Sequence, residues 1–368
     1  MTPEAQRLAR LRGGLDAIEV GARGIESLAR NASCTRLRAI VIAGLTPTEI
    51  VRRVYGLVPD AMSPFAMIVS QRYVARILDN AGASLLTAYR EKGVLTQSEA
   101  KIADVADQGT GDSPLARHRR EQETLRLLRL KAAGDPAAAN LILHPRLLVT
   151  IVGVTHAIEF DYLVAADADP FYRVGTIKSY ADRGGKTDQT DIRAALREAS
   201  VGTLAMRQFL DQAGADPQRA ADRVDLVLRA PGSFVPRLIP AMRAESELAS
   251  LVRALSVAPA ELDEIEQLIP ANASLAQQRV IDQLPNHYCS NCKEHCALWQ
   301  HCRAQAQARG LPVLLGDEAA ERFAAVGSIT RALDLLNGRG RPPDNAAEAA
   351  LASELRRADE VLDRIANG

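Results

Sequence analysis

The chain has 368 residues, of which 47% are hydrophobic and 24% are charged, so it is long enough to bury a sizeable core. Lysine plus arginine equals aspartate plus glutamate, 45 of each, so no net charge draws the whole protein to a polyanion. Any contact with nucleic acid must come from a local patch. No segment has the length and apolarity of a membrane span, and the N-terminus lacks a signal-peptide pattern, so we expect a cytoplasmic protein with no membrane partner.

The first 135 residues are predicted to form an N-terminal helical region. Apolar residues recur at helical spacing over residues 3–30. Thr46 is followed by proline and then, three residues after it, by glutamate, which is the pattern of a helix N-terminus. Two further helices are predicted over residues 68–90 and 98–133.

Residues 136–215 have a different texture and are predicted to form the core. Short runs rich in β-branched and apolar residues, separated by Pro, Gly and Asp, predict strands over residues 140–144, 146–154, 156–165 and 172–180. A long helix is predicted over Thr190–Leu210, with Thr190 as its N-cap.

The remaining chain is predicted to be helical around a cluster of cysteines. We expect a helical region over 216–284, the cysteine cluster over 285–310, and helical hairpins over 311–368 that break at a Gly/Pro-rich turn. The order of elements predicts an α+β fold, with a small central mixed sheet flanked by many helices.

Four polar residues on the predicted strands are expected to lie together. Alternate residues of a strand point the same way, so Glu159 and Asp161 share a face, as do Thr176 and Lys178. A hairpin through residues 166–170 would bring both pairs onto one side of the sheet. Glu159 and Asp161 would then face Lys178.

The following helix offers a further acid to this group. Asp191, Ala195, Glu198 and Gly202 lie on one stripe of the helix by their spacing. The plainer interpretation of each acid is a solvated charge, because acids are seldom buried without partners.

The order strand, hairpin, strand and helix, with Asp161 on the first strand and Lys178 on the second, resembles the PD-(D/E)xK nuclease superfamily. The resemblance is to its RecB-like branch, which includes iron–sulfur exonucleases of CRISPR adaptation. It implies a restriction-endonuclease-like sheet and a DNA nuclease that uses Mg²⁺ or Mn²⁺. Asp161 matches the family's first acid and metal ligand, Lys178 matches its lysine, and Glu198 stands where the family has glutamine.

The family's second acid is missing, because Thr176 stands two residues before the lysine. A threonine hydroxyl is a poor ligand for Mg²⁺, which prefers anionic oxygens. Glu159, as a second metal ligand, or Glu198, reaching in from the helix, would supply the missing carboxylate. The alternative is a protein that has lost catalysis and serves as a DNA-binding or scaffolding subunit, for example of a phage-defence or DNA-processing complex.

Four cysteines within fourteen residues predict a metal site. Two, three and five residues separate them in turn, which lets their thiolates enclose one zinc ion or one iron–sulfur cluster without long loops. They are Cys289, Cys292, Cys296 and Cys302.

The identity of the metal and of its four ligands is left open by the sequence. The resemblance implies a 4Fe-4S cluster with one cysteine near the N-terminus, a position that Cys34 matches. Either Cys34 joins three of the later cysteines, or the local four suffice and Cys34 is a buried apolar residue. Zinc is the alternative, with His287, His295 and His301 as substitute ligands, although a surface position is favoured for each histidine.

Three other features of the sequence bear on function. The basic stretch from Arg117 to Lys131 would suit a phosphate backbone or, equally, a solvated helix face. Residues 184–187 lack the first glycine of a phosphate-binding loop, which excludes an NTPase. His144, before a proline, is expected to end a strand rather than to act as a base.

Overall fold

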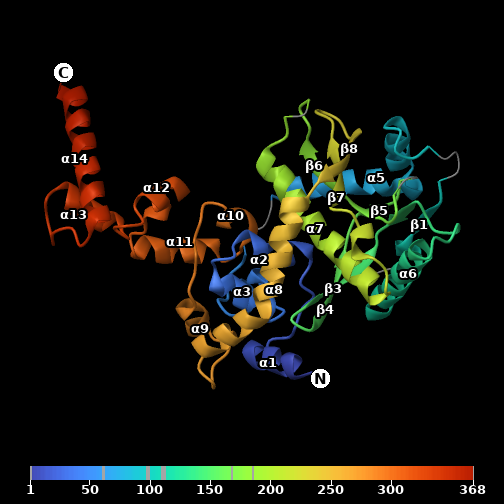
Figure 1. The fold of residues 1–368 in the computed structure, drawn as a ribbon, viewed down its shortest axis with the longest axis horizontal. Coiled ribbons are helices and arrows are strands. Elements are labelled where there is room, and N and C mark those ends of the chain that lie inside the picture. The colour runs from blue at the N-terminus through green and yellow to red at the C-terminus, as the bar shows by residue number, and fades with distance from the viewer. Residues whose placement is uncertain are drawn as a thin grey trace. The chain divides into compact units, whose positions relative to one another are not determined.

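The computed structural model describes residues 2–59, 63–96, 100–108, 113–166, 169–184 and 186–367 (Figure 1). The chain divides into two compact units, Met1–Leu284 and Pro285–Gly368. Each unit is described by itself below.

Unit 1 contains a six-stranded mixed sheet in the order β1-β2-β5-β6-β7-β8. The pairs β1/β2 and β6/β7 are parallel and the other neighbours are antiparallel. The strands are β1 (Ile102–Asp104), β2 (Leu141–Leu143), β5 (Tyr162–Val164), β6 (Arg173–Ala181), β7 (Arg223–Arg229) and β8 (Pro236–Arg243).

Helix α5 (Pro64–Glu91) packs on one face of this sheet. Its Tyr73, Ile77 and Tyr89 are fully buried and belong to one apolar cluster with Tyr162 and Ile177 of the strands. Burial of large apolar side chains of this kind is the main stabilising contribution to such a layer.

Helix α7 (Gln189–Gln212) covers the opposite face, and a glycine allows it to come close. A Cβ at Gly202 would lie 2.7 Å from Val174 Cγ2 and 2.9 Å from Phe160 Cζ, so a larger residue would push the helix off the sheet. Helices α2 (Ala22–Arg30) and α8 (Glu245–Leu268) pack beside α7 (Figure 1).

A separate hairpin of β3 (Arg146–Ile151) and β4 (Val154–Glu159) forms a two-stranded sheet. It packs against α6 (Pro114–Ala132) and α7. The other elements of unit 1 are α1 (Pro3–Arg12), α3 (Thr35–Ile42), α4 (Pro47–Arg53), η1 (Val105–Gln108), η2 (Pro217–Arg219) and α9 (Gln278–Gln283).

Unit 2 is helical. Its elements are α10 (Cys292–His295), α11 (Trp299–Ala308), η3 (Pro312–Leu315), α12 (Asp317–Arg322), α13 (Ile329–Leu336) and α14 (Ala346–Asn367). A small apolar core forms between α13 and α14 around Leu335, Leu351 and Ala352. Across the helices of both units, within the residues described, none has an apolar stretch long enough to cross a bilayer.

The predicted α+β class is confirmed, and two predicted helix starts can be compared with the structure. Thr46 caps α4, because its Oγ1 accepts a hydrogen bond of 3.3 Å from the amide of Glu49. The long helix predicted from Thr190 begins at Gln189. Its cap is Asp188, whose Oδ1 accepts a 2.7 Å hydrogen bond from the Thr190 amide.

The helical assignments of residues 1–135 and 216–284 are wrong in part. The first region contains β1, which has only three residues and therefore too little length to show a period. The second contains β7 and β8. Apolar runs as short as that in β7 fit a buried strand as well as a helix turn, and prolines at 236 and 240 hide β8, which forms the edge of the sheet.

The single strand predicted over 156–165 is two strands in different sheets. β4 ends at Glu159 in the hairpin, whereas β5 begins at Tyr162 in the main sheet. The alternation of faces is therefore interrupted at Phe160 and Asp161. The prediction that Glu159 and Asp161 share a face is wrong for this reason.

Candidate functional site

Asp161 lies at the start of β5 and is held by the neighbouring strand. Its Oδ2 accepts a 2.7 Å hydrogen bond from the amide of Ile177 and a 3.2 Å hydrogen bond from Thr176 Oγ1. Burial raises the pKa of Asp161, and these hydrogen bonds and the charge of Lys178 oppose that rise. A carboxylate is thus fixed at a half-buried position beside a lysine.

Lys178 and Glu198 form the second part of the site. Lys178 Nζ lies 2.8 Å from Glu198 Oε2, and the two side chains are 15% and 28% exposed. Burial by itself would raise the pKa of Glu198, but the charge of Lys178 and its hydrogen bond hold that pKa below its usual value. Glu198 is therefore a carboxylate at neutral pH.

The structure therefore brings together Asp161, Thr176, Lys178 and Glu198. Thr176 and Lys178 point to the α7 side of β6, since Ile177 between them packs in the cluster on the α5 side. The close approach of α7 at Gly202, one turn after Glu198, lets Glu198 reach Lys178.

The two carboxylates retain oxygens that could bind a divalent ion. Within the described residues, every hydrogen bond to the Asp161 side chain uses Oδ2, and the one to Glu198 uses Oε2. Asp161 Oδ1 and Glu198 Oε1 accept none there. Two anionic oxygens beside a lysine suit Mg²⁺ or Mn²⁺, which keep several waters when few protein ligands are offered.

Glu159 does not join this group. Its Oε1 lies 2.8 Å from Arg146 Nη1 and 3.3 Å from Arg120 Nη2. Both oxygens of Glu19 bind Arg146 as well, at 2.6 Å. Glu159 is paired with these arginines and not with Lys178. We therefore correct the prediction that Glu159 is a catalytic residue and a metal ligand.

A buried ionic network supports the strands beneath the site. Asp225 on β7 is fully buried, and both its oxygens bind Arg173 of β6 at 3.1 Å. Tyr89 of α5 donates to the same carboxylate at 2.6 Å, and so does the amide of Ala241, also at 2.6 Å. Because removing one partner would leave a buried charge, this network fixes β6 relative to β7 and α5.

His144 has a structural role that the sequence interpretation missed. Its backbone has φ +52°, a left-handed conformation that is costly for a residue with a side chain. Its Nδ1 lies 2.9 Å from Asp104 Oδ1, and its amide donates a 3.0 Å hydrogen bond to the carbonyl of Asp161. His144 thus helps to place the main chain of Asp161.

Three arginines of the basic stretch on α6 are paired within the protein. Arg117 lies 3.6 Å from Glu19, and Arg126 lies 2.6 Å from Glu123. Arg120 is bound to Glu159, as described above. The interpretation of a helix face balanced by acids therefore fits this stretch better than a phosphate-binding surface.

The cysteines divide between the two units. Cys34 is buried at the start of α3 in unit 1, whereas the other four lie in unit 2. Cys289 Sγ and Cys292 Sγ are 3.5 Å apart, and a hydrogen bond from the Cys292 thiol lowers the pKa of Cys289 to about 7. All five are thiols rather than disulfides.

The cysteine pair has a spacing that fits a shared metal. Two sulfurs bound tetrahedrally to one zinc at about 2.3 Å lie about 3.8 Å apart. The remaining cysteines do not complete the set: no group of three or more His, Cys, Asp or Glu side chains in the described part of the chain is arranged around a metal position.

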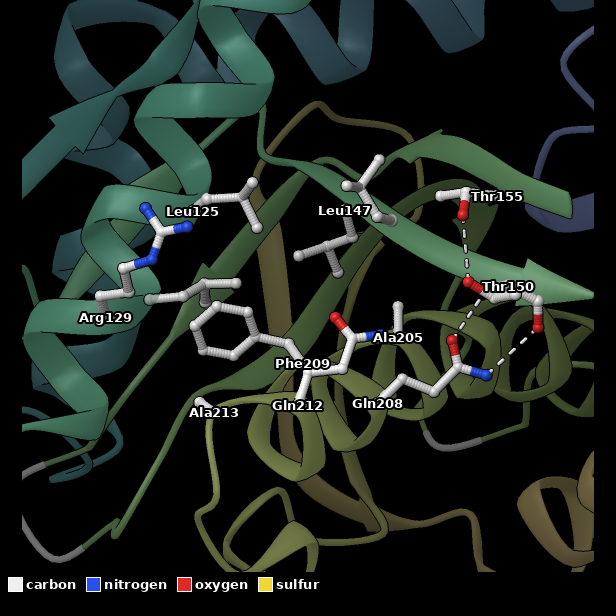
Figure 2. A pocket seen from close by; sticks show the side chains of 12 residues that line it. Leu125, Arg129, Leu147, Thr150, Thr155, Ala205, Gln208, Phe209, Gln212 and Ala213 are labelled. Carbon is white, nitrogen blue, oxygen red and sulfur yellow. Dashed lines mark hydrogen bonds between the residues drawn. The ribbon is translucent and has the colours of Figure 1, made fainter. Parts of the chain in front are cut away.

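A cavity of about 330 Å³ lies between α6, β3 and α7 (Figure 2). Leu125, Leu147 and Phe209 form much of its wall. Gln208 bonds both to the amide and to the carbonyl of Thr150, at 2.8 and 3.3 Å. None of the predicted site residues lines this cavity.

Comparisons of the chain with family models, with curated proteins and with solved structures find no match.

Proposed function

We propose that this protein is a metal-dependent DNA nuclease of the PD-(D/E)xK type whose second acid is Glu198. The observation that carries the proposal is the 2.8 Å contact between Lys178 Nζ and Glu198 Oε2 next to the fixed carboxylate of Asp161. The order of strand, strand and helix around these residues agrees with the resemblance found in the sequence.

In this proposal Asp161 and Glu198 hold the ion. A bound Mg²⁺ or Mn²⁺ would supply polarisation of a phosphate and a hydroxide at neutral pH. Asp161 is kept in place by the amide of Ile177 and by Thr176. Lys178 carries the positive charge that orients an attacking water and stabilises charge that develops on the phosphate.

Thr176 acts through Asp161. A hydroxyl donor at this position orients one oxygen of Asp161 and leaves the other exposed to a ligand. In this proposal Glu198 supplies, from α7, the carboxylate that the family carries on β6 at the position of Thr176.

The second candidate is a nuclease-fold protein without catalysis that binds DNA or assembles a larger defence or DNA-processing complex. The same ion pair favours it, because a lysine neutralised by a glutamate is less available to a phosphate. This second hypothesis requires that Lys178 and Glu198 stay paired when DNA and divalent ions are present.

We also propose that Cys289, Cys292, Cys296 and Cys302 hold a 4Fe-4S cluster, with zinc as the alternative and Cys34 as a competing ligand. The 3.5 Å pair of Cys289 and Cys292 supports a shared ion. Cysteines that bind metal rather than form disulfides are typical of a reducing compartment, which is consistent with a cytoplasmic location.

The test is Mn²⁺-dependent cleavage of labelled single-stranded and duplex DNA. Asp161→Ala and Glu198→Gln should each reduce the cleavage rate about 10²- to 10³-fold, because each removes a charge that acts on the transition state. Glu159→Gln is the matched control and should stay within about threefold of the wild type. An inert wild type, or equal loss in Glu159→Gln and Glu198→Gln, would reject the assignment of Glu198.

A further inference from the structure

Three arginines around the candidate site have no partner among the described residues. Arg23 is exposed on α2, and Arg193 and Arg197 lie one turn apart on α7. No hydrogen bond or ion pair joins them to any other side chain in the described ranges. They come from two helices that pack against each other, and α7 also carries Glu198.

One of these charges acts on a site residue. Arg23 lies close enough to Glu198 to contribute to the lowering of its pKa, and it acts on Tyr180 in the same direction. Arg197 is half-buried, and burial and the nearby charge of Arg30 lower its pKa, whereas the charges of Glu26 and Glu247 oppose that shift. A cation held under these conditions gains from an anion supplied by a ligand.

A hollow of about 510 Å³ lies at the end of β6, beside the start of α7. Its lining combines Tyr180 with two basic residues, Arg183 and Lys186, and two acidic residues, Asp188 and Asp191. Tyr180 lies close enough to Lys178 and Glu198 for both charges to act on its hydroxyl. The hollow thus borders the group that contains Lys178.

Three of the α6 arginines differ in one respect from those of α2 and α7. Arg117, Arg120 and Arg126 are balanced by Glu19, Glu159 and Glu123. Arg23, Arg193 and Arg197 make no such ion pair in the described part of the chain, and Glu26 and Glu247 lie close enough to act on Arg197 only through their charge.

We infer that Arg23, Arg193 and Arg197 form the surface that binds the DNA phosphate backbone beside Asp161, Lys178 and Glu198. The inference deepens the proposed function by naming where its substrate lies. Guanidinium groups suit phosphates because they can donate two parallel hydrogen bonds to them. Two of the arginines lie on the helix that supplies Glu198, so a bound strand passes next to the reacting group.

The size of the effect follows from counterion release. Each phosphate contact contributes about 0.9 to the slope of log K against log salt on duplex DNA and about 0.7 on single strands. Loss of three contacts should therefore reduce the magnitude of the slope by about 2 to 3. Near 0.1 M salt, this corresponds to at least a tenfold weaker binding.

The experiment measures binding of fluorescein-labelled duplex and single-stranded oligonucleotides, by anisotropy and over a series of salt concentrations. The full-length chain carries Asp161→Ala throughout, and no Mg²⁺ or Mn²⁺ is added, so that cleavage does not interfere and the cysteine segment keeps its own metal. The test variant adds Arg23→Ala, Arg193→Ala and Arg197→Ala to this parent chain. The matched control removes three charges from α6 instead, by Arg119→Ala, Arg126→Ala and Arg129→Ala.

The α2/α7 variant should bind at least tenfold more weakly with a reduced salt slope, and the α6 variant should stay within about twofold of the parent. Lysine at the same three positions should restore much of the affinity, which also separates loss of charge from misfolding. Equal weakening in both triple variants, or no binding by the parent, would overturn the inference. Arginine-dependent binding by a wild type that cleaves nothing would support the surface and reject the nuclease activity.

Discussion

The candidate site in unit 1 and the cysteine segment in unit 2 differ in how the chain arranges them. Asp161 and Lys178 form a weak pattern in the sequence, yet the fold brings them together with Glu198. The cysteines form a strong pattern, and Cys289 Sγ lies 3.5 Å from Cys292 Sγ, but no three metal-binding side chains of the described residues gather around one position. The difference lies in what holds each set of side chains in place.

The site in unit 1 rests on regular structure. Thr176 and Lys178 lie on a strand whose neighbours are fixed by the buried Asp225 network, and Glu198 lies on a helix of 24 residues. The cysteines lie on short helices and turns, α10 being only four residues long. Metal binding and folding of such a site are coupled, so we expect a bound ion to fix the positions of these thiolates.

The largest effect should come from removing the metal of unit 2. Purified protein should contain about one cluster, or one zinc ion, per chain. Because a structural metal contributes about 10–16 kcal/mol of binding free energy at neutral pH, its loss should unfold the segment around Cys292. Metal analysis and limited proteolysis would measure this, and Cys292→Ser should lower the metal content about tenfold or more.

Two controls sharpen the comparison of the two units. Cys34→Ser should leave the metal content unchanged if the local four cysteines suffice, and should lower it if Cys34 is a ligand. The Asp161 group should keep its structure after chelation, because its positions depend on β6 and α7. Protein without iron or zinc that shows the same proteolysis pattern before and after chelation would contradict the assignment of a metal site.

The sequence predicts the candidate site in part, and the parts that fail have physical reasons. The sequence predicts that Asp161 and Lys178 lie together because the hairpin that joins β5 and β6 is a local feature. Glu159 was misplaced because the chain leaves one sheet and enters another within two residues, which no period shows. The choice of Glu198 over Glu159 depends on how closely α7 packs on β6.

Contacts between segments far apart in the chain also set the positions of residues that the sequence interpretation missed. β7 pairs with β6 in parallel, and α7 connects the two strands along the chain. The place of β7 in the sheet therefore depends on residues that are far away in the sequence. Arg23 on α2 lies close enough to act on Glu198 of α7 only because the two helices pack together. His144 lies before a proline, as the sequence shows, but its contact with Asp104 requires the pairing of β1 with β2.

A smaller effect is expected from restoring the family's acid on β6. Thr176 is 4% exposed and donates to Asp161, so Thr176→Glu places a second carboxylate at a buried position. Without divalent ions we expect a loss of about 3 kcal/mol in the free energy of unfolding. Mn²⁺ at about 100 times its Kd should return about 2.7 kcal/mol.

Denaturant unfolding with and without Mn²⁺ measures both values. The control Thr176→Val removes only the hydroxyl, so it should cost about 1 kcal/mol and respond to Mn²⁺ no more than the wild type. If the wild type is inert and Thr176→Glu gains cleavage, the natural protein has lost catalysis at this position. A Thr176→Glu variant that does not respond to Mn²⁺ would count against a metal position beside Asp161.

The smallest expected effect tests whether the end of unit 2 is held without metal. Arg331 Nη2 lies 2.8 Å from Glu348 Oε2, and both side chains are buried between α13 and α14. The hydrogen bond from Arg331, followed by that from the Asp344 amide, lowers the pKa of Glu348 to about 2. Because the folded pKa lies below the unfolded value of 4.5, the stabilisation is present above pH 4.5 and is lost as the pH falls towards 2.

Hydrogen exchange of the α13 and α14 amides between about pH 5 and pH 3 would follow this loss. The wild type should lose protection there as the pH falls, whereas Glu348→Gln should start less protected and change little. Glu354→Gln is the control, since Glu354 pairs with Arg322 at an exposed position and should behave like the wild type. Chelation should leave this exchange unchanged, because the two helices are held by apolar contacts and one ion pair. If chelation also released α13 and α14, the metal would organise the whole of unit 2 rather than the cysteine segment alone.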